Sequence, residues 1–296
     1  MKYLLLGGAG FVGTHLAKRL MSAGHEVLII DSCTTSQPPT FRVTFIQADL
    51  REYDISEHMA WCDVVYYLAG SVGVDNVVKN PHSTIMNNIG LIYQLIPVFT
   101  KYNKKVIFSS TSEVYGEGPF EESNNLSIGP STKLRWSYAA AKLATEFMIT
   151  TSSFPHVIVR FFNITGPGQL GDYGMVLPRF IEAAKAGTDL VVHGDGSQVR
   201  SFCHVADAVT MLKLCETFDG EVFNIGNDQP VTIKELAERV IVVSGSTSQI
   251  KYIPLEQVYV KNHGDIHNRI PVLRKIKALT GYTAKYKLDD IIKDML

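Results

Sequence analysis

Short apolar runs alternate with helical patterns over the first 160 residues. Six runs are rich in Val, Ile and Leu: YLLL (3–6), EVLII (26–30), VTFI (43–46), VVYYL (64–68), KVIF (105–108) and HVIVR (156–160). Near-continuous apolar runs of this length are typical of parallel strands buried on both faces. Helical patterns lie between them, with Val12, Leu16 and Leu20 on one face and further segments near 84–101 and 137–151. The alternation predicts an α/β fold with a Rossmann-type, doubly wound parallel sheet.

The pattern changes after RFFNITGPGQ (160–169), where Gly and Pro cluster and helices mix with short strands such as EVFNIG (221–226). We therefore predict two domains. Residues 1–165 form a Rossmann domain. The segment at about 200–228 rejoins this domain, because EVFNIG can add a strand to its sheet. Residues 166–296 form a smaller, mixed α/β domain for the substrate.

Composition narrows the class of partner. A chain of 296 residues with 46% hydrophobic composition can bury a large core. The net charge is −1 and no stretch gathers Lys and Arg, which argues against nucleic acid and anionic membranes as partners. The N-terminal apolar run is too short for a signal peptide, and no later run approaches the ~18 residues of a membrane span. The four cysteines form no C-x-x-C pair: Cys33, Cys62, Cys203 and Cys215. We therefore expect a protein of the reducing cytoplasm that holds no structural metal.

A glycine-rich turn joins the first strand to the first helix in LLLGGAGFVGTHLAKRL. Gly8-x-Gly10-x-x-Gly13 satisfies the dinucleotide fingerprint, in which glycines allow a tight turn and a close approach to a pyrophosphate. The phosphates would lie at the N-terminus of the helix, where free N–H groups and the helix dipole favour anions. A glycine turn without a ligand is the alternative. The residues expected to contact the cofactor here are Gly7, Gly10, Phe11, Val12 and Gly13.

Asp31 ends the second strand and selects between the two nicotinamide cofactors. A carboxylate there accepts hydrogen bonds from the adenosine ribose and repels a 2′-phosphate, so we predict NAD rather than NADP. Asp49, after the third strand, either contacts the adenine or caps the next helix. We add Leu50, Leu68 and Ala69, which follow strands at the same edge, to the cofactor site.

Tyr138 and Lys142 are four residues apart in a helical pattern, RWSYAAAKLATEF, and so share a face. Lowering a tyrosine pKa from ~10 to ~7 takes about 4 kcal/mol of preferential stabilisation of the phenolate. A cation ~4 Å away supplies roughly that amount at an effective dielectric constant near 20. Such a tyrosine can take a proton from a sugar hydroxyl while hydride leaves the same carbon, with Thr111 completing the relay. The alternative is a partly buried Tyr beside a Lys that reaches to solvent.

Taken together, these motifs resemble a known family. The glycine turn, Asp31, STSEVYG (110–116), YAAAK (138–142), RFFNITGPGQ (160–169), GDGSQVRSF (194–202) and EVFNIGN (221–227) resemble the extended short-chain dehydrogenase/reductases that remodel nucleotide sugars. The resemblance spans nearly the whole chain. It implies tightly held NAD that is recycled in each turnover, a nucleotide-diphosphate sugar as substrate, and a homodimer built on two helices per subunit.

The resemblance also assigns roles residue by residue. Thr111, Tyr138 and Lys142 match the catalytic triad. Asn163 and Arg200 match contacts to the substrate diphosphate and sugar, and Arg269 matches a second arginine on the diphosphate side. Arginine grips phosphate oxygens with two parallel hydrogen bonds. Without that context, each arginine could equally form only a surface salt bridge. The chain departs from its relatives at Tyr67, where many carry His, and at Ser201, where many epimerases carry Asp.

The reaction is decided within STSEVYG. Family members first oxidise C4 of the sugar, and 4,6-dehydratases then need an acid where this chain has Ser112. UDP-glucuronate decarboxylases characteristically carry Thr-Ser-Glu here, with Ser112 binding the sugar and Glu113 orienting the ring. Arg269 or a water would assist protonation at C5. UDP-glucuronate decarboxylation is thus the favoured prediction, UDP-sugar 4-epimerisation is the alternative, and a 4,6-dehydratase or a non-catalytic NAD sensor is less favoured.

Overall fold

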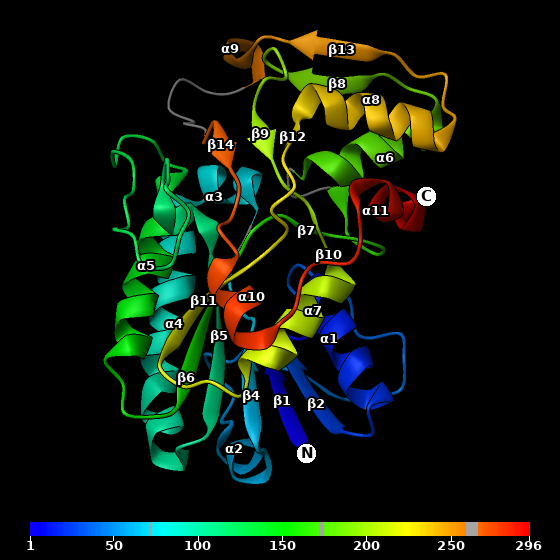
Figure 1. The fold of residues 1–296 in the computed structure, drawn as a ribbon. Helices are drawn as coiled ribbons and strands as arrows, with labels where there is room; N and C mark the ends of the chain where they lie inside the picture. The colour runs from blue at the N-terminus through cyan, green and yellow to red at the C-terminus, as the bar shows by residue number, and fades with distance from the viewer. Residues whose placement is uncertain (72, 172–174, 259–265) are drawn as a thin grey trace.

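A seven-stranded sheet forms the centre of the computed structural model, which describes residues 1–71, 73–171, 175–258 and 266–296 (Figure 1). Every neighbouring pair in this sheet is parallel. From edge to edge the strands are β11 (Glu221–Ile225), β6 (His156–Phe161), β5 (Lys105–Thr111), β4 (Val64–Tyr67), β1 (Lys2–Leu6), β2 (Glu26–Asp31) and β3 (Thr44–Gln47). All six apolar runs of the first 160 residues are strands of this sheet, which confirms the predicted Rossmann-type fold.

Helices cover both faces of the sheet, which is why its strands are continuous apolar runs. Tyr3 and Leu5 of β1 pack into a core on one face, and Leu4 and Leu6 pack into a second core on the other. The first core is completed by helices α1 (Phe11–Ser22), α7 (Val205–Cys215) and α10 (Arg274–Thr280). The second is completed by α2 (Ser56–Trp61), α4 (Pro81–Tyr102) and α5 (Trp136–Thr150). Short α3 (Val74–Lys79) precedes α4.

The strand order reverses between β1 and β4. From β1 the chain adds β2 and β3 towards one edge, whereas β4, β5 and β6 extend towards the other. In open α/β sheets the crevice at such a reversal, beyond the carboxyl ends of the strands, is where ligands bind. The glycine turn lies there because it follows β1 directly.

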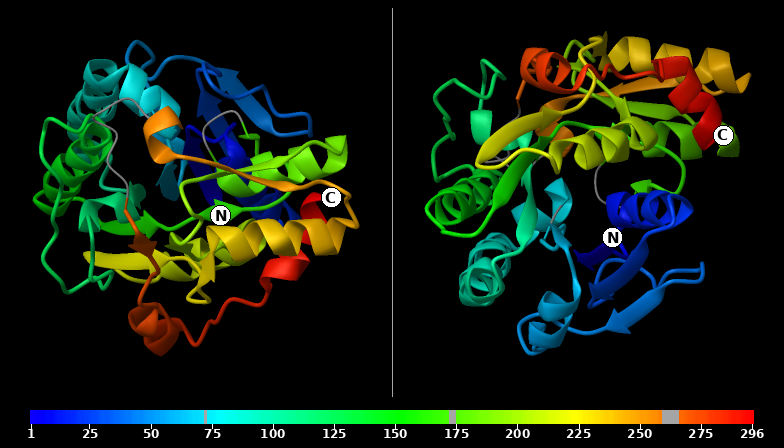
Figure 2. Two further views of the ribbon diagram at one scale, coloured as in Figure 1. Left: turned by 90° about the horizontal axis from the view of Figure 1, so that it is seen from above. Right: turned by 60° about the horizontal axis from the view of Figure 1, so that its bottom comes forward.

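The remaining elements stack at the carboxyl end of the sheet (Figures 1 and 2). Their strands are β7 (Ile164–Thr165) with β10 (Cys203–His204), β8 (Leu190–His193) with β13 (Ile250–Ile253), and β9 (Val199–Arg200) between β12 (Val231–Thr232) and β14 (Asn268–Arg269). Their helices are α6 (Val176–Ala186), α8 (Ile233–Ser244), α9 (Leu255–Val258) and α11 (Leu288–Met295). A separate core joins α6, β8, α8 and α11. The EVFNIG segment returns to the first sheet as β11, beside β6. The domain boundary near 165 stays a prediction.

Strand β5 is longer than its apolar run. It continues through Ser109 and Ser110 to Thr111, because these residues pair with β6 as far as Phe161. A 3₁₀ turn, η1 (Ser112–Tyr115), follows at once. The polar stretch STSEVYG is therefore half strand and half turn, and both halves lie at the carboxyl edge.

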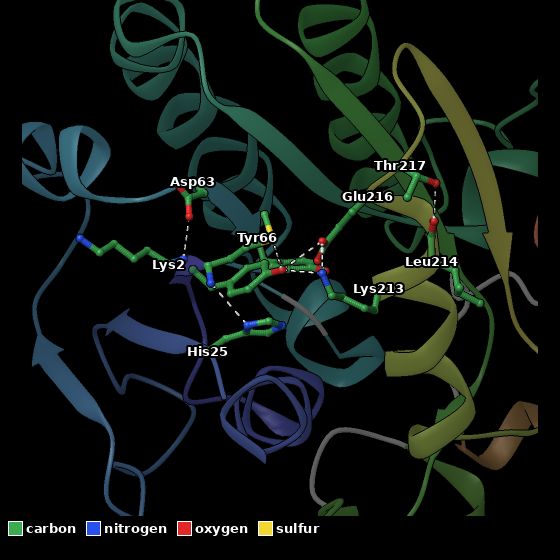
Figure 3. A network of polar contacts seen from close by, with 10 residues as sticks. Lys2, His25, Asp63, Tyr66, Lys213, Leu214, Glu216 and Thr217 are labelled. Carbon is green, nitrogen blue, oxygen red and sulfur yellow. Dashed lines mark hydrogen bonds and ion pairs between the residues drawn. The ribbon is translucent and has the colours of Figure 1, made fainter. Parts of the chain in front are cut away.

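A polar cluster ties α7 to the face of the sheet, as Figure 3 shows. The hydroxyl of Tyr66 donates to Glu216 Oε1, and the hydroxyl of Tyr3 donates to Glu216 Oε2 at 3.2 Å. Lys213 forms an ion pair with Glu216 and donates to the Tyr3 hydroxyl at 2.5 Å. Burial first, and then Glu216, raises the pKa of Tyr66 well above its usual value, so this phenol stays neutral. The cluster is structural, since it fastens α7 to β1 and β4.

The part of the chain that the structure describes, residues 1–71, 73–171, 175–258 and 266–296, offers neither a membrane-spanning helix nor a cluster of metal ligands. Helices there are too short or too polar to cross a membrane. The same residues bring no three His, Cys, Asp or Glu side chains together as metal ligands.

Candidate functional site

A cavity of about 1770 Å³ runs along the carboxyl edge of the sheet and under the C-terminal layer. Pockets for one drug-sized ligand usually measure roughly 300–1,000 Å³, so this cavity has room for two such molecules side by side. One end is lined by the glycine turn and Asp31, and the other by α6, Arg200 and Phe202. Tyr138, Lys142 and Glu113 line it too.

The glycine turn has no space for side chains at three of its positions, and at Gly8 a Cβ would lie 2.7 Å from Cβ of Leu5. Gly7 has φ +77°, and a Cβ there would lie 2.4 Å from the backbone nitrogen of Ala69. A Cβ on Gly13 would lie 2.6 Å from Cα of Gly8, so the helix could not pack as closely on the strand. Around Gly10 a Cβ would meet only the carbonyl oxygen of Gly7, at 3.8 Å. Gly10 therefore leaves the backbone open towards the cavity.

Helix α1 begins at Phe11, and no side chain of the described residues caps it. The first amide of the helix with an intrahelical acceptor belongs to Thr14, which donates to the Gly10 carbonyl at 2.9 Å. The preceding amides, of Phe11, Val12 and Gly13, face the open turn, and all three residues line the cavity. Free N–H groups and the positive end of the helix dipole fit a pyrophosphate.

Asp31 is held rigidly at the end of β2. Its Oδ2 accepts from the backbone of Ala9 at 2.9 Å, and its Oδ1 accepts from the backbone of Cys33 at 2.8 Å and from Ser36 Oγ at 3.2 Å. These bonds orient the carboxylate where the cavity passes the glycine turn, which fits the hydroxyls of a ribose. Leu50, Leu68 and Ala69 line the same part of the cavity.

Asp49 also lines the cavity, but its carboxylate is occupied by Arg51. It accepts from the Arg51 backbone at 2.9 Å and from its guanidinium at 3.0 Å, and the guanidinium hydrogen bonds lower the pKa of Asp49. The alternative that Asp49 caps the next helix is wrong, since the N-cap position of α2 is Ile55. Contact with the adenine stays a prediction.

Lys142 is buried between α5 and β5. Its Nζ donates to the Ser109 carbonyl at 3.0 Å and lies 5.1 Å from the centre of the Phe108 ring. Burial lowers the pKa of Lys142 to about 8, and Glu146 acts against that shift. One turn earlier, Tyr138 has its pKa raised, first by burial and then by the charge of Glu113. The protein's own groups therefore do not lower the pKa of Tyr138 towards neutral pH. This differs from our expectation from the Tyr–Lys spacing alone.

Thr111 and Ser112 differ in what they face. The Thr111 side chain accepts from the backbone of Glu113 at 3.3 Å and so caps η1. Its hydroxyl can still donate its own proton. Ser112 and Glu113 are among the cavity-lining residues of the described chain and Thr111 is not, although all three are buried. A place for Thr111 in the proton relay stays a prediction.

Two guanidinium groups converge on the carboxylate of Glu113. Arg135 Nη2 lies 3.4 Å and Arg269 Nη1 lies 3.3 Å from the same oxygen, Glu113 Oε1. The three side chains are 6%, 15% and 11% exposed, respectively, so bulk water screens the charges little. Arg269 Nη2 also donates to Asn163 Oδ1. Strand β14 carries Arg269 to this point by pairing with β9.

The side-chain contacts of Arg269 include Glu113 and Asn163, and its place on the diphosphate side stays a prediction. Arg200 is also buried, lines the cavity, and donates from Nη1 to the carbonyls of Val199 at 3.0 Å and His267 at 2.9 Å. Asn163 donates to the Ser201 carbonyl at 2.9 Å. Neither Arg200 nor Arg269 therefore forms only a surface salt bridge, which was the alternative for both.

Arg135 was missed by the sequence analysis. It precedes Tyr138 by three residues and occupies the N-cap position of α5, so it lies one helical turn from Tyr138. That spacing was the available signal. The contact with Glu113 could not be deduced, because it depends on how α5 meets η1.

The fold and the glycine turn are those of Rossmann-type enzymes that depend on a dinucleotide. The chain belongs to the NAD dependent epimerase/dehydratase family, whose sequence profile matches residues 3–226. It is an enzyme, and its cofactor is NAD.

Three relatives show the range of reactions. A UDP-N-acetyl-alpha-D-glucosaminuronate decarboxylase of Bacillus cytotoxicus is 35% identical, over 99% of this chain and 96% of the relative. UDP-glucuronic acid decarboxylase 5 of Arabidopsis thaliana is 31% identical, over 97% and 86%. The crystal structure of a UDP-glucuronic acid 4-epimerase from Bacillus cereus, in complex with UDP-glucuronic acid and NAD, has a TM-score of 0.87 at 27% identity and covers 99% of this chain and 97% of that one. All three relatives are named for a UDP-linked sugar that is a uronic acid.

Proposed function

We propose that the protein decarboxylates a UDP-linked hexuronic acid through a 4-keto intermediate. The observation that supports a hexuronate as substrate is the pair of guanidiniums, from Arg135 and Arg269, that meet at Glu113 in the cavity. The choice of decarboxylation is supported by the Thr-Ser-Glu sequence at 111–113 and by the likeness to two decarboxylases. The substrates to test are UDP-glucuronate, which the sequence favours, and UDP-N-acetylglucosaminuronate, which the Bacillus cytotoxicus relative is named for.

The charges at this point favour an anionic sugar. The guanidiniums of Arg135 and Arg269 both lie at the cavity wall beside Glu113. Arginine binds carboxylates with two parallel hydrogen bonds, and such bonds are stronger where water is excluded. A C6 carboxylate can accept charged hydrogen bonds from such arginines, whereas the C6 hydroxyl of a neutral hexose carries no charge to pair with them. A hexuronate therefore fits the cluster better than a hexose.

The cofactor is assigned to the sheet edge. Gly7, Gly10 and the amides at the start of α1 hold the pyrophosphate, Asp31 holds the adenosine ribose, and Asp49, Leu50, Leu68 and Ala69 surround the adenine side. Tyr138 and Lys142 border the nicotinamide end. Bound NAD supplies the hydride acceptor for C4, later the hydride donor, and in its oxidised form a positive charge that favours the Tyr138 phenolate.

The chain's own residues handle the protons. Tyr138 Oη takes the proton of the C4 hydroxyl, with Lys142 stabilising the phenolate and the Thr111 hydroxyl next in the relay. The C4 ketone makes the substrate a β-keto acid, so the C5–C6 bond breaks, CO₂ leaves, and its electron pair passes into the C4–C5 enolate. Arg269 or a water assists the protonation of C5, where the new proton takes the place of the lost carboxyl group. Tyr138 finally gives its proton back to the C4 oxygen.

The other residues bind and orient. Ser112 hydrogen-bonds the sugar, and Glu113 fixes the two arginines and the ring. Asn163 and Arg200 bind the sugar and the diphosphate. Ser112 offers no acid for expelling a C6 hydroxyl, which disfavours 4,6-dehydration.

Epimerisation at C4 is the second candidate. It is favoured by the likeness to a UDP-glucuronic acid 4-epimerase, whose substrate carries the same carboxylate. The arginine pair does not separate the two reactions, because both substrates are uronates. What separates them is the C5–C6 bond: it breaks in one reaction and survives in the other.

The assembly and compartment are proposed with the function. Tyr93 on α4 is 72% exposed and Phe147 on α5 is 65% exposed, and these two helices pack together on one face. Large exposed aromatic side chains on adjoining helices favour an interface with another protein. We assign it to a homodimer, in the cytoplasm. Light scattering would show a dimer for the wild type and a monomer for Tyr93→Glu.

A product survey tests the reaction. The purified protein is incubated with UDP-glucuronate, UDP-N-acetylglucosaminuronate, UDP-glucose and UDP-N-acetylglucosamine, and the products are separated and weighed by mass spectrometry. We expect loss of CO₂ from a uronate and no reaction with the hexoses. An isomer of unchanged mass would favour epimerisation, and loss of water would favour dehydration.

A further inference from the structure

A buried ion pair lies one helical turn from Lys142, and the reaction proposed above does not use it. Glu146 follows Lys142 by four residues in α5, so both side chains leave the same side of the helix. Arg160 of β6 donates to Glu146 twice, from Nη2 to Oε2 at 2.7 Å and from Nε to Oε1 at 3.0 Å. Both members are almost wholly buried, at 5% and 6% side-chain exposure. Burying two charges is costly, and replacing such a pair with neutral side chains often costs little. A role beyond folding is therefore worth testing.

The pair fixes α5 against β5. Ser110 Oγ donates to Glu146 Oε1 at 2.5 Å, and the preceding residue, Ser109, accepts from Lys142 Nζ at 3.0 Å. Two successive residues of the strand thus bind two successive turns of the helix. The Glu146 carboxylate therefore fixes the position of α5 along β5, and that position places the Lys142 ammonium beside the Ser109 carbonyl.

The other side of the pair reaches the turn that carries Glu113. Arg160 Nη1 donates to the Tyr115 hydroxyl at 2.8 Å, and Tyr115 belongs to η1. The Tyr115 hydroxyl donates to Asn224 Oδ1 at 2.8 Å, and Asn224 Nδ2 donates to the Val272 carbonyl at 3.2 Å, shortly after β14. A continuous buried hydrogen-bond chain therefore lies behind the cavity, between α5, η1 and the segment after β14.

We propose that Glu146, with Arg160 as its partner, is a positioning residue that holds the Lys142 ammonium against β5. The proposal rests on the proposed function only in taking Lys142 as a working residue. Burial lowers the pKa of Lys142 to about 8, and Glu146 acts in the opposite direction. Removing the carboxylate lowers that pKa further, so the ammonium loses its charge nearer to neutral pH.

The other groups around Lys142 do not replace this carboxylate. Strand β5 offers the Ser109 carbonyl and the Phe108 ring. Helix α4 offers the neutral amide of Asn88, whose Oδ1 lies beside Gly70 as Lys142 Nζ does. The titratable or charged groups near this region include Tyr138 and Glu146 of α5, Arg160 of β6, and Glu113 of η1 with its partners Arg135 and Arg269. Strand β4 adds Tyr67, whose ring stacks on that of Phe108. The charge of Glu113 raises the pKa of Tyr138, whereas the charge of Glu146 is the one that raises the pKa of Lys142.

The test measures the protonation of Lys142 directly. Trace acetic anhydride labels the uncharged amine through the cavity that Lys142 lines, and mass spectrometry of the Lys142 peptide gives labelling against pH. The variants are Glu146→Gln, and Glu146→Gln combined with Arg160→Met, which leaves no unpaired buried charge. We expect the labelling midpoint to fall by about one pH unit or more in Glu146→Gln, which loses one nearby opposite charge, and to fall less in the double variant, which also loses the like charge of Arg160.

Glu216→Gln is the matched control, because it neutralises a buried carboxylate in the cluster of Figure 3. Its melting temperature is expected to fall while its labelling midpoint stays at the wild-type value. The alkaline limb of the pH–rate profile should move with the labelling midpoint in the Glu146 variants. A wild-type midpoint in folded Glu146→Gln would overturn the proposal, and failure of both variants to fold would assign the pair to folding alone. If the midpoint moves in a protein that converts no UDP-sugar, the proposed function fails and this inference stands.

Discussion

Replacing Arg135 with methionine removes one of the two guanidiniums at Glu113 and keeps an apolar stem. Arg135 Nη2 and Arg269 Nη1 lie 3.4 and 3.3 Å from Glu113 Oε1, and their side chains are only 6% and 15% exposed. Because water screens this region little, removing Arg135 costs more free energy than removing one partner of a surface ion pair. The variant leaves Arg269 to serve both Glu113 and the substrate carboxylate.

The size of the effect follows from the bond that is lost. A hydrogen bond to a charged partner contributes about 1.5–3 kcal/mol. If the substrate carboxylate receives that bond from Arg135, kcat/KM for the UDP-hexuronate falls by about 10- to 150-fold. Arg135→Lys keeps the charge and loses the planar fork, so we expect a smaller loss.

The assay compares an acidic and a neutral sugar. Product formation is followed by chromatography with the UDP-hexuronate, and UDP-glucose affinity is measured by calorimetry. UDP-glucose affinity should not change, because its C6 carries no charge. Arg239→Met is the matched control: it removes a guanidinium from an ion pair with Asp289 that is 47% exposed at the arginine. Full turnover of the uronate by Arg135→Met, or an equal loss of UDP-glucose affinity, would refute the assigned role.

Three further outcomes are expected. Gly13→Ala places a methyl group 2.6 Å from Cα of Gly8, so calorimetry should show NAD affinity reduced about tenfold or more, with the circular dichroism spectrum retained. Turnover should fall as pH rises through about 8, because the Lys142 ammonium is charged below its lowered pKa and uncharged above it; a flat pH–rate profile to pH 10 would contradict this. Glu216→Gln weakens the charged hydrogen bond to Tyr66, costing roughly 2 kcal/mol, or about 3 °C in Tm by scanning calorimetry for a chain of this length.

The central sheet could be predicted because its strands are buried on both faces, which makes them continuous apolar runs. The C-terminal strands could not be predicted in the same way. β7, β9, β10, β12 and β14 contain two residues each, and their pairing partners are distant in the chain. β5 was predicted too short for a related reason, since its polar end is held by β6 rather than by its own sequence.

The candidate site divides along the same line. Local spacing found the glycine turn, Asp31, Tyr138 and Lys142, which all line one cavity. It could not show that Arg269 reaches Glu113, because β14 pairs with a strand about 70 residues earlier in the chain. The direction of the Tyr138 pKa shift was hidden for the same reason, since burial and the Glu113 charge arise only from packing.

The most direct test of decarboxylation follows the carboxyl carbon itself. UDP-glucuronate and UDP-N-acetylglucosaminuronate, each labelled with ¹³C at C6, are incubated with the wild type and with Tyr138→Phe, and ¹³C NMR is recorded over time. For one of the sugars, the account predicts that the wild type converts the carboxylate signal into labelled bicarbonate, and that the variant does so far more slowly. A label that stays on the sugar while the ring signals change to those of the C4 epimer would contradict it.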